Sequence, residues 1–442
     1  MNRPHGESAT QGQAIRGEQT PTRRRFSVMW MLFVCVMINY LDRSNLSVVA
    51  PRLTEELHLS PVALGTMLSA FGWTYALFQI PASRFVDRVN PRLLFAVMLM
   101  LWSLATLLMG FVGTFVALIA LRLTVGAMEA PSYPINNRVV TTWFPESERG
   151  GAIGFYTSGQ FVGLAFFTPL LAWLETHYGW RFIFQATGAI GVIWSLAWWF
   201  LYRDPTQARG VNQAELRLIE KGGGIPDLSR KLGQSRTASA WKDLAIVLGR
   251  RKLWGIYIGQ FGLTSIQWFF LTWFPMYLVR YKHIELAKAG LLSSFPFLAA
   301  FIGVILGGFL SDWLLRCGLG ITLARKIPIV TGSLLASLIF LANRFQDPRL
   351  VIACMTCSCF GCGFASITWS VVSTVAPERL IGLTGGVFNF ISNCSAIVVP
   401  IVIGLLIRGG SFSRPLLFIS GMGAMGVCSY VFLVGSIERV SE

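Results

Sequence analysis

Charged residues are scarce in this chain of 442 residues. Asp, Glu, Lys and Arg together make up 13% of the sequence, whereas they make up about a quarter of an ordinary soluble protein. Apolar residues account for 54%, and the mean hydropathy is +0.58. This composition argues against soluble domains and predicts a protein that crosses a membrane many times.

Enzyme motifs are missing as well. The sequence contains none of the patterns H-E-x-x-H, G-x-S-x-G or G-x-x-x-x-G-K-[ST], and the last absence also excludes an ATP-driven pump with its own motor. Residues 318–320 read Gly-Leu-Gly but lack the rest of a dinucleotide-binding fingerprint. We therefore predict that the protein is not an enzyme and uses no cofactor.

About twelve apolar stretches of helical length follow one another along the chain. The first is not a cleavable signal, because 25 polar residues precede it and it contains Asp42 and Arg43 rather than ending at a small-residue cleavage site. The predicted fold is an all-α membrane protein with twelve transmembrane helices. The stretches lie at 26–50, 62–82, 93–111, 115–140, 151–174, 181–201, 253–279, 289–310, 327–342, 349–374, 382–407 and 414–436.

Basic residues outnumber acidic ones, 37 against 21, which gives a formal net charge of +16. They gather in alternate loops, and the positive-inside rule makes such loops cytoplasmic. We therefore place both termini in the cytoplasm and interpret the charge as membrane topology, not as nucleic-acid binding. The basic residues of these loops are Arg23, Arg24, Arg25, Arg84, Arg88, Arg92, Arg203, Arg209, Lys221, Arg230, Lys231, Arg250, Arg251, Lys252, Arg316, Arg325 and Lys326.

Eight cysteines raise the possibility of a metal site. Cys354, Cys357, Cys359 and Cys362 have the spacing C-x2-C-x-C-x2-C, and similar spacings build zinc sites. They lie among small residues in an apolar stretch, which favours close helix packing instead. On a helix, Cys359 also points well away from Cys357, so one metal ion could not bind all four. We predict no metal site.

A polar stretch divides the apolar segments into six and six. Landmarks recur in both sets: residues 65–87 match 290–312 at an offset of 225, and residues 145–156 match 377–388 at an offset of 232. Such a repeat is typical of transporters, whose site lies near the bilayer midplane between the halves. The predicted parts are a cytoplasmic N-terminal tail at 1–25, a six-helix bundle at 26–201, a cytoplasmic central loop at 202–252, a second six-helix bundle at 253–436 and a cytoplasmic C-terminal tail at 437–442.

The loop after the second stretch resembles the loop motif of the major facilitator superfamily, G-x-x-x-D-R-x-G-R. Residues 83–92 read S-R-F-V-D-R-V-N-P-R, with Ser83 and Asn90 where the family usually has glycine. A second copy, at 308–312, keeps the first glycine and the acid. We interpret Asp87, Arg88 and Asp312 as partners in gate-forming ion pairs or helix caps, and an ordinary solvated loop charge is the alternative.

Two pairs of opposite charges lie inside predicted helices, where each charge costs at least about 2.5 kcal/mol. Asp42 and Arg43 are neighbours in the first helix, and Arg122 and Glu129, seven residues apart, share one face of the fourth. The fork of Arg43 matches a carboxylate, which makes it the candidate for an anionic substrate. Glu129 near a mobile arginine could alternate between proton holder and counter-ion. The alternative is a static ion pair that holds helices together.

Sparse polar and aromatic side chains accompany Arg43 in the other predicted helices. Singly, each is as suited to a hydrogen bond between helices as to ligand binding. Together they indicate a hydroxyl-rich ligand with a single charge. They are Tyr75, Gln79, Asn136, Asn137, Gln160, Gln260, Thr368, Trp369 and Asn389.

Four segments closely resemble the anion:cation symporter family of the major facilitator superfamily. They are N-Y-L-D-R-S-N at 39–45, E-A-P-S-Y-P-I-N-N-R at 129–138, G-F-Y-T-S-G-Q-F-V-G-L-A-F at 154–166 and G-F-A-S-I-T-W-S at 363–370. The resemblance covers about residues 23–440. It implies a major facilitator fold of two pseudo-symmetric six-helix bundles in a bacterial inner membrane.

The resemblance also assigns roles to residues. It implies that Asp42 and Glu129 couple protons and that Arg43 holds the substrate carboxylate. At 391–394 the chain reads Ile-Ser-Asn-Cys, where the family relative is glycine-rich. These bulkier residues lie next to the implied pocket, so the identity of the sugar acid stays open. The remaining pocket residues that it implies are Tyr40, Tyr75, Arg122, Gln160, Gln260, Ser366, Thr368, Trp369 and Asn389.

The implied function is proton-driven uptake of a sugar acid, D-galactonate or a similar aldonate, by alternating access in a monomer. A monoanion that enters a negative-inside cell needs at least one proton to cancel its charge. The alternatives are symport of glucarate, a hexuronate or an aromatic acid, and a sugar-acid sensor that transports nothing. A central loop of about fifty residues argues against the sensor, because it is short for a signalling domain. The expected partners are the sugar-acid anion, protons and the lipid bilayer.

Overall fold

The computed structural model describes residues 20–226, 240–377, 380–407 and 410–439, and long helices dominate these ranges. The first half contains α1 (Arg24–Glu56), α2 (Pro61–Arg88), α3 (Pro91–Met109), α4 (Phe115–Glu129), α5 (Ser132–Trp143), α6 (Glu146–Tyr178) and α7 (Trp180–Leu201). The second half contains α11 (Arg251–Thr272), α12 (Phe274–Met276), α13 (Leu286–Arg316), α14 (Ile321–Ser337), α15 (Pro348–Phe364), α16 (Thr368–Val375), α17 (Ile381–Leu406) and α18 (Ser413–Cys428). Two short helices, α8 (Gln213–Lys221) and α10 (Ala240–Leu248), lie in the central loop.

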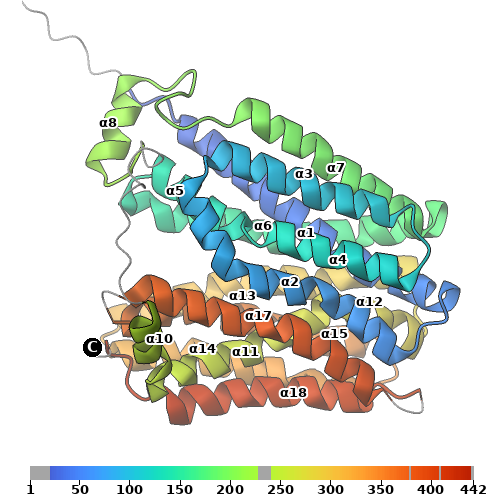
Figure 1. Cartoon of the computed structure of the whole chain (residues 1–442). Coiled ribbons are helices and arrows are strands. Elements are labelled where there is room, and N and C mark those ends of the chain that lie inside the picture. Colours follow the sequence, from blue (N-terminus) through green and yellow to red (C-terminus); the bar gives the residue numbers. More distant parts are fainter. Residues whose placement is uncertain (1–19, 227–239, 378–379, 408–409, 440–442) are drawn as a thin grey trace, which may run out of the picture.

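Eleven spans among the described residues are long and apolar enough to cross a membrane. The helix α11, followed by α12, has the length of the remaining one and packs with α17 and α18 in the second half. The all-α prediction with twelve transmembrane helices in two bundles is therefore confirmed. Figure 1 shows the helices of the two halves as two adjoining layers.

Local sequence signals explain where several of these helices begin. The side chain of Ser60 accepts a hydrogen bond from the backbone N–H of Ala63 at 3.1 Å, and Pro61 follows as the first residue of α2. Asn90 does the same for α3, accepting from the backbone N–H of Arg92 at 2.8 Å. Its φ of −57° is an ordinary value, so the turn at this point needs no glycine.

The halves pack tightly at the end of the bundle away from the described chain ends, which we call the distal end. A Cβ atom at Gly65 of α2 would clash with the carbonyl of Pro400 in α17, and one at Gly290 of α13 would clash with Ala172 in α6. Gly65 and Gly290 are matching positions of the internal repeat. The same close helix contact therefore occurs twice between the halves, as small residues allow.

The opposite end carries the short helices α8 and α10, and we call it the terminal end (Figure 1). Toward this end of α6 and α17, a Cβ atom at Gly154 or Gly386 would meet no atom within 4 Å. These two glycines also match in the repeat. The contact between the halves is thus asymmetric, tight at the distal end and open beside these glycines.

Two spans are interrupted near their middle. α4 ends at Glu129 and α5 begins at Ser132, because Pro131 between them lacks the N–H that a continuous helix would need and clashes with the preceding turn. The matching span of the second half breaks at residues 365–367, between α15 and α16. Such breaks at mid-membrane are typical of substrate sites in secondary transporters.

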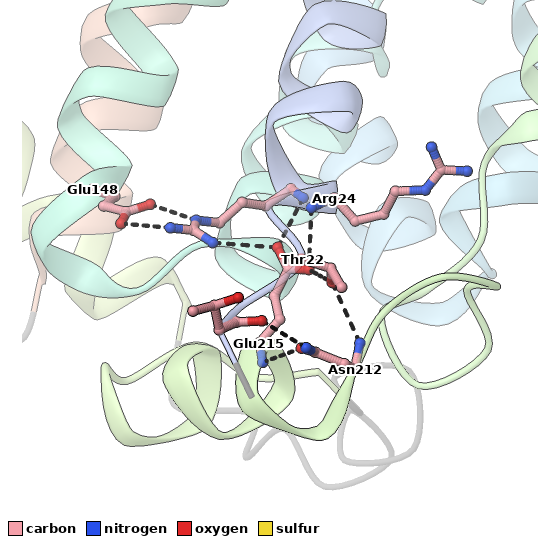
Figure 2. A network of polar contacts seen from close by, with 7 residues as sticks. Thr22, Arg24, Glu148, Asn212 and Glu215 are labelled. Carbon is pink, nitrogen blue, oxygen red and sulfur yellow. Dashed lines mark hydrogen bonds and ion pairs between the residues drawn. The ribbon is translucent and has the colours of Figure 1, made fainter. Parts of the chain in front are cut away.

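The start of α1 is capped by a carboxylate from the central loop (Figure 2). No side chain next to α1 in sequence caps it. Instead, Glu215 of α8 accepts hydrogen bonds from the backbone N–H groups of Arg24 and Arg25, both at 3.1 Å, and from the Thr22 hydroxyl at 2.5 Å. A carboxylate suits this place because the first N–H groups of a helix lack partners and carry a partial positive charge.

Arg25 connects this cap to α6. Its guanidinium lies 2.8 Å from Glu148 and 3.2 Å from Glu215 (Figure 2). Thr22, Arg25, Glu148 and Glu215 form what we call the clasp. It joins the first part of the central loop to the first half, whereas Val247 of α10 is buried in an apolar cluster of the second half.

The environment of Glu215 determines how the clasp responds to pH. Burial opposes its charge, but the hydrogen bonds from Thr22, Arg25 and Arg24 outweigh burial, and the pKa of Glu215 lies below its usual value. A carboxyl group with a lowered pKa stabilises the folded state above its unfolded pKa of about 4.3, and this stabilisation is lost as pH falls through the folded value. The clasp therefore contributes at neutral pH.

Replacing Glu215 by Gln should destabilise the protein, because neutral oxygen accepts these hydrogen bonds more weakly. We expect a loss of about 1–3 kcal/mol, seen as a lower melting temperature of the purified protein at pH 7. Glu220→Gln, at an exposed position of the same helix, should change nothing. The difference between wild type and Glu215→Gln should shrink below about pH 4. Equal melting temperatures at pH 7 would contradict the capping role.

Candidate functional site

A buried ion pair joins α1 to α4 in the middle of the first half. Nη2 of Arg43 lies 2.6 Å from Oε1 of Glu129, and Nε of Arg43 donates to the same oxygen at 2.8 Å. Glu129 is fully buried and Arg43 is 6% exposed. Removing one partner of such a pair leaves an uncompensated buried charge, so each residue depends on the other.

Arg122 does not form the expected pair with Glu129. Seven residues along a helix share a face but span about 10 Å along its axis, which is too far for direct contact. Nη1 of Arg122 instead donates to the backbone carbonyl of Asp42 at 3.1 Å. Arg122 therefore holds α4 against α1, while Arg43 takes the carboxylate.

Aromatic rings surround the guanidinium of Arg43. Its central carbon lies 4.9 Å from the ring centre of Tyr40, 4.9 Å from that of Phe71 and 4.7 Å from that of Tyr75. Cation–π contacts of this kind are strongest where water is excluded. Arg122 also lies over Phe71, at 5.6 Å. The rings stabilise the cation without occupying its hydrogen-bond donors.

Asp42 lies apart from this pair. Successive helix residues point about 100° away from each other, so Asp42 and its neighbour Arg43 face different surroundings. Asp42 is fully buried, and among the described residues neither of its carboxyl oxygens has a hydrogen-bond donor of normal geometry. The Trp102 side chain and the Arg122 charge lie nearby. A buried carboxyl group with so few donors is more easily accommodated as the neutral acid.

Amide and hydroxyl groups form two further contacts. The Thr368 hydroxyl donates to Oε1 of Gln260 at 2.7 Å, linking α16 to α11. Nδ2 of Asn389 donates to Oε1 of Gln79 at 2.6 Å, which links the second half to the first. Asn393, one turn further along α17, donates to Oδ1 of Asn389 at 3.2 Å. Of the residues at 391–394, Asn393 thus helps to orient the amide of Asn389.

The other expected pocket residues are less enclosed. Gln160 on α6 and Ser366 at the α15–α16 break are partly buried. Trp369 is 51% exposed and packs edge-on against Phe388, with ring centres 4.7 Å apart.

Two adjacent asparagines of α5 have different surroundings. Asn137 accepts a hydrogen bond from the Tyr156 hydroxyl at 2.7 Å. The amide atoms of Asn136 are buried and lack partners among the described residues. The structure brings together the side chains of Tyr40, Arg43, Tyr75, Arg122 and Glu129. Asp42 joins this group through its backbone carbonyl, and Gln260–Thr368 and Gln79–Asn389 are separate pairs.

The expected gate residues lie at the terminal end. Asp312 of α13 is exposed and lies 3.5 Å from Nη1 of Arg325 in α14. Asp87 and Arg88 belong to the last turn of α2, but their side chains lie outside the described residues. A gating role for these three residues stays a prediction.

Sequence reasoning missed several contributors to this site. Asn39 donates to both Glu129 and Ser132, and Phe71 contacts both Arg43 and Arg122. Asn39 precedes Arg43 by four residues, so the two share a helix face, and this spacing was the available signal. Nothing in the sequence pointed to Phe71, since one more aromatic in an apolar span is ordinary.

The cysteine cluster is part of a close helix contact. A Cβ atom at Gly361 of α15 would clash with the backbone of Gly332 in α14, and Cys359 is buried. Within the described part of the chain, no three His, Cys, Asp or Glu side chains are arranged to hold a metal ion.

Comparison with known proteins fits this architecture. The family described as Major Facilitator Superfamily matches residues 32–400. The chain belongs to the major facilitator superfamily. Members of this superfamily are transporters, and the chain is accordingly a multi-pass membrane transporter and not an enzyme.

Individual relatives align with this chain over nearly its whole length. It is 47% identical to the D-galactonate transporter of Escherichia coli O6:H1, over 95% of this chain and 98% of the relative. It is 40% identical to the probable galactarate/D-glucarate transporter of Bacillus subtilis, over 95% of both chains. Among solved structures, a D-xylose-proton symporter has a TM-score of 0.68 at 13% identity, covering 93% of this chain and 97% of its own. This last likeness shows the fold alone.

Proposed function

We propose that the protein takes up a sugar acid, D-galactonate or a similar aldonate, together with protons. The observation that carries the proposal is Arg43, a buried guanidinium held among aromatic rings and paired with Glu129. A substrate carboxylate can replace Glu129 on this fork with matching geometry. Relatives named as sugar-acid transporters support the choice of substrate class.

The charge of the second half favours a substrate with one carboxylate. In the six apolar stretches predicted for the second half, Lys and Arg occur only at the first residue of two stretches, as Arg349 and Arg414. The far end of a substrate held by Arg43 would meet neutral groups there, including Gln260, Thr368 and Asn389. Amides and hydroxyls suit the hydroxyl groups of an aldonate, whereas a second carboxylate would be buried without a cation.

The acids of the first half are the proposed proton carriers. When the substrate takes Arg43, Glu129 loses its counter-ion, and protonation then removes a buried charge that would otherwise be costly. Asp42 has no cation bonded to its carboxyl oxygens among the described residues and is the second carrier. Arg122, Tyr40, Tyr75, Gln160, Gln260, Ser366, Thr368, Trp369 and Asn389 are the proposed remainder of the pocket.

Alternating access is the proposed mechanism, with both termini in the cytoplasm of a bacterium and the protein in its inner membrane. Basic loops at the terminal end support this orientation. The tight distal contacts at Gly65 and Gly290, and the open space at Gly154 and Gly386, then correspond to a site that opens inward. The proposed boundaries are bundles at 26–201 and 253–436, joined by the central loop at 202–252.

Uptake in proteoliposomes tests the proposal directly. With D-galactonate outside and an alkaline interior, wild-type protein should accumulate the anion and make the external medium more alkaline. If both acids carry a proton, a negative-inside potential should also stimulate uptake, because it acts with about 2.3 kcal/mol per charge per 100 mV. Protein-free liposomes and a protonophore are the controls. Uptake that ignores both the pH gradient and the potential would refute proton coupling.

A counterflow screen distinguishes one carboxylate from two. Liposomes loaded with unlabelled D-galactonate should take up labelled D-galactonate, and external aldonates should compete well. Glucarate and galactarate should compete at least about tenfold less well, since one uncompensated buried charge costs more than about 1.4 kcal/mol. Hexuronates and aromatic acids belong in the same screen. Preference for a dicarboxylate would favour the function named for the 40% identical relatives.

Two substitutions separate binding from coupling. Glu129→Gln keeps the shape of the side chain in a neutral form, so binding should survive while pH-driven accumulation fails. Arg43→Ala removes charge-assisted hydrogen bonds and should weaken binding by about 2 kcal/mol or more, roughly thirtyfold.

Glu175→Gln is the matched control for Glu129→Gln. Glu175 is a buried glutamate of α6 at the distal end, 3.7 Å from Arg52, and its replacement should leave accumulation intact. A well-folded Glu129→Gln protein that accumulates D-galactonate with wild-type pH dependence would remove Glu129 from the mechanism. If both Glu129→Gln and Arg43→Ala only lower the yield of folded protein, the ion pair is structural.

A further inference from the structure

The two carboxyl oxygens of Glu129 have different surroundings. Oε1 accepts from Nε of Arg43 at 2.8 Å and from Nδ2 of Asn39 at 3.0 Å, and Nη2 of Arg43 lies 2.6 Å away. Oε2 is buried, and no described residue donates a hydrogen bond to it. The side chain therefore presents one crowded oxygen and one free oxygen.

This asymmetry decides where a proton can bind. A carboxylate oxygen accepts about two hydrogen bonds through its lone pairs, and three donor nitrogens already approach Oε1. A proton added there would face these donors at close range. Oε2 has its lone pairs free and is the oxygen that can be protonated without breaking existing contacts.

Asn39 is the donor that can remain when Arg43 is engaged elsewhere. The proposed substrate would draw the guanidinium of Arg43 away from Glu129. The Asn39 amide is anchored independently, because Nδ2 also donates to Oγ of Ser132 at 2.9 Å. Asn39 is fully buried and lies one turn before Arg43 on the same face of α1. It thus links Glu129 at the end of α4 to the start of α5.

Other charged and titratable groups around Glu129 do not take this role. Among the described residues none donates to Oε2. The Arg122 guanidinium contacts a backbone carbonyl of α1, not Glu129. The groups that face the pair from the elements packed against it are Tyr40, Asp42 and Arg43 of α1, Tyr75 of α2, Arg122 of α4 and Tyr133 of α5.

We propose that Asn39 is a positioning residue for proton transfer: its amide fixes Oε1 of Glu129, so that Oε2 takes and releases the proton while Arg43 exchanges partners. The inference rests on the proposed proton-coupled function. Asn39 would thus join Asp42 and Glu129 in proton coupling, although it carries no charge and is not among the proposed substrate-binding residues.

Infrared difference spectroscopy on the purified full-length protein tests this without substrate. Titration should reveal a carbonyl band of a protonated carboxyl group that disappears in Glu129→Gln. In Asn39→Leu the band should persist to higher pH, because a donor that favours the carboxylate is gone. The expected displacement of its midpoint is about one pH unit. In liposomes the alkaline limit of uptake should move in the same direction.

Asn45→Leu is the matched control. Asn45 is another fully buried asparagine of α1, and it donates to the Thr187 hydroxyl at 3.3 Å rather than to a carboxylate. Its replacement removes a similar interhelical hydrogen bond and should leave the Glu129 band where it is. Asn39→Ser, which shortens the side chain without adding bulk, serves if Asn39→Leu folds poorly.

The outcomes are distinct. An unchanged midpoint in both Asn39 variants, or an equal displacement in Asn45→Leu, overturns the positioning role. Wild-type protein that shows the Asn39-dependent band but accumulates no aldonate refutes the proposed transport function and leaves the role of Asn39 standing. Wild-type protein that accumulates an aldonate, with a band that does not depend on Asn39, supports the transport function and refutes the role of Asn39.

Discussion

The ion pair between Arg43 and Glu129 is the contact on which the site depends. Both residues are buried, and each is the neutralising partner of the other. Charges inside a membrane protein are tolerated when paired, and a pair whose members can be separated by a competing anion or proton is also a switch. The aromatic rings around Arg43 keep water away from it, which strengthens its attraction for any carboxylate.

Helix interruptions give this pair its setting. Pro131 ends α4 just after Glu129, so the carboxylate lies at a helix end rather than within a regular helix, where neighbouring turns would crowd it. The break between α15 and α16 places Ser366 and Thr368 at the matching level of the second half. In the proposed site, one half contributes charge and the other contributes neutral hydrogen-bonding groups, a division that suits a ligand with one charged end.

Much of this could be predicted from the sequence, because charged residues in apolar helices are costly and therefore conspicuous. Asp42, Arg43, Arg122 and Glu129 stood out for that reason, and the twelve helices followed from hydropathy. The partner of Glu129 could not be predicted. Helical spacing shows which residues share a face of one helix. Whether Glu129 pairs with Arg43 or with Arg122 depends on how α1 packs against α4. Contacts between distant segments, such as Gln79 with Asn389, were inaccessible for the same reason.

The residues of the clasp and of the buried ion pair are synthesised before the second half of the chain. All residues of the clasp, and all four charges of the site, precede residue 226. The remaining 216 residues (442 minus 226) take about 10–40 s to synthesise at ordinary rates, and domains generally fold as units during that time. The first half can therefore enter the membrane with Arg43 already neutralised by Glu129 and with α1 already capped by Glu215, before any helix of the second half reaches the bilayer. Among the described residues, the neutralising partner of Arg43 and the carboxylate that caps α1 both lie in this first half.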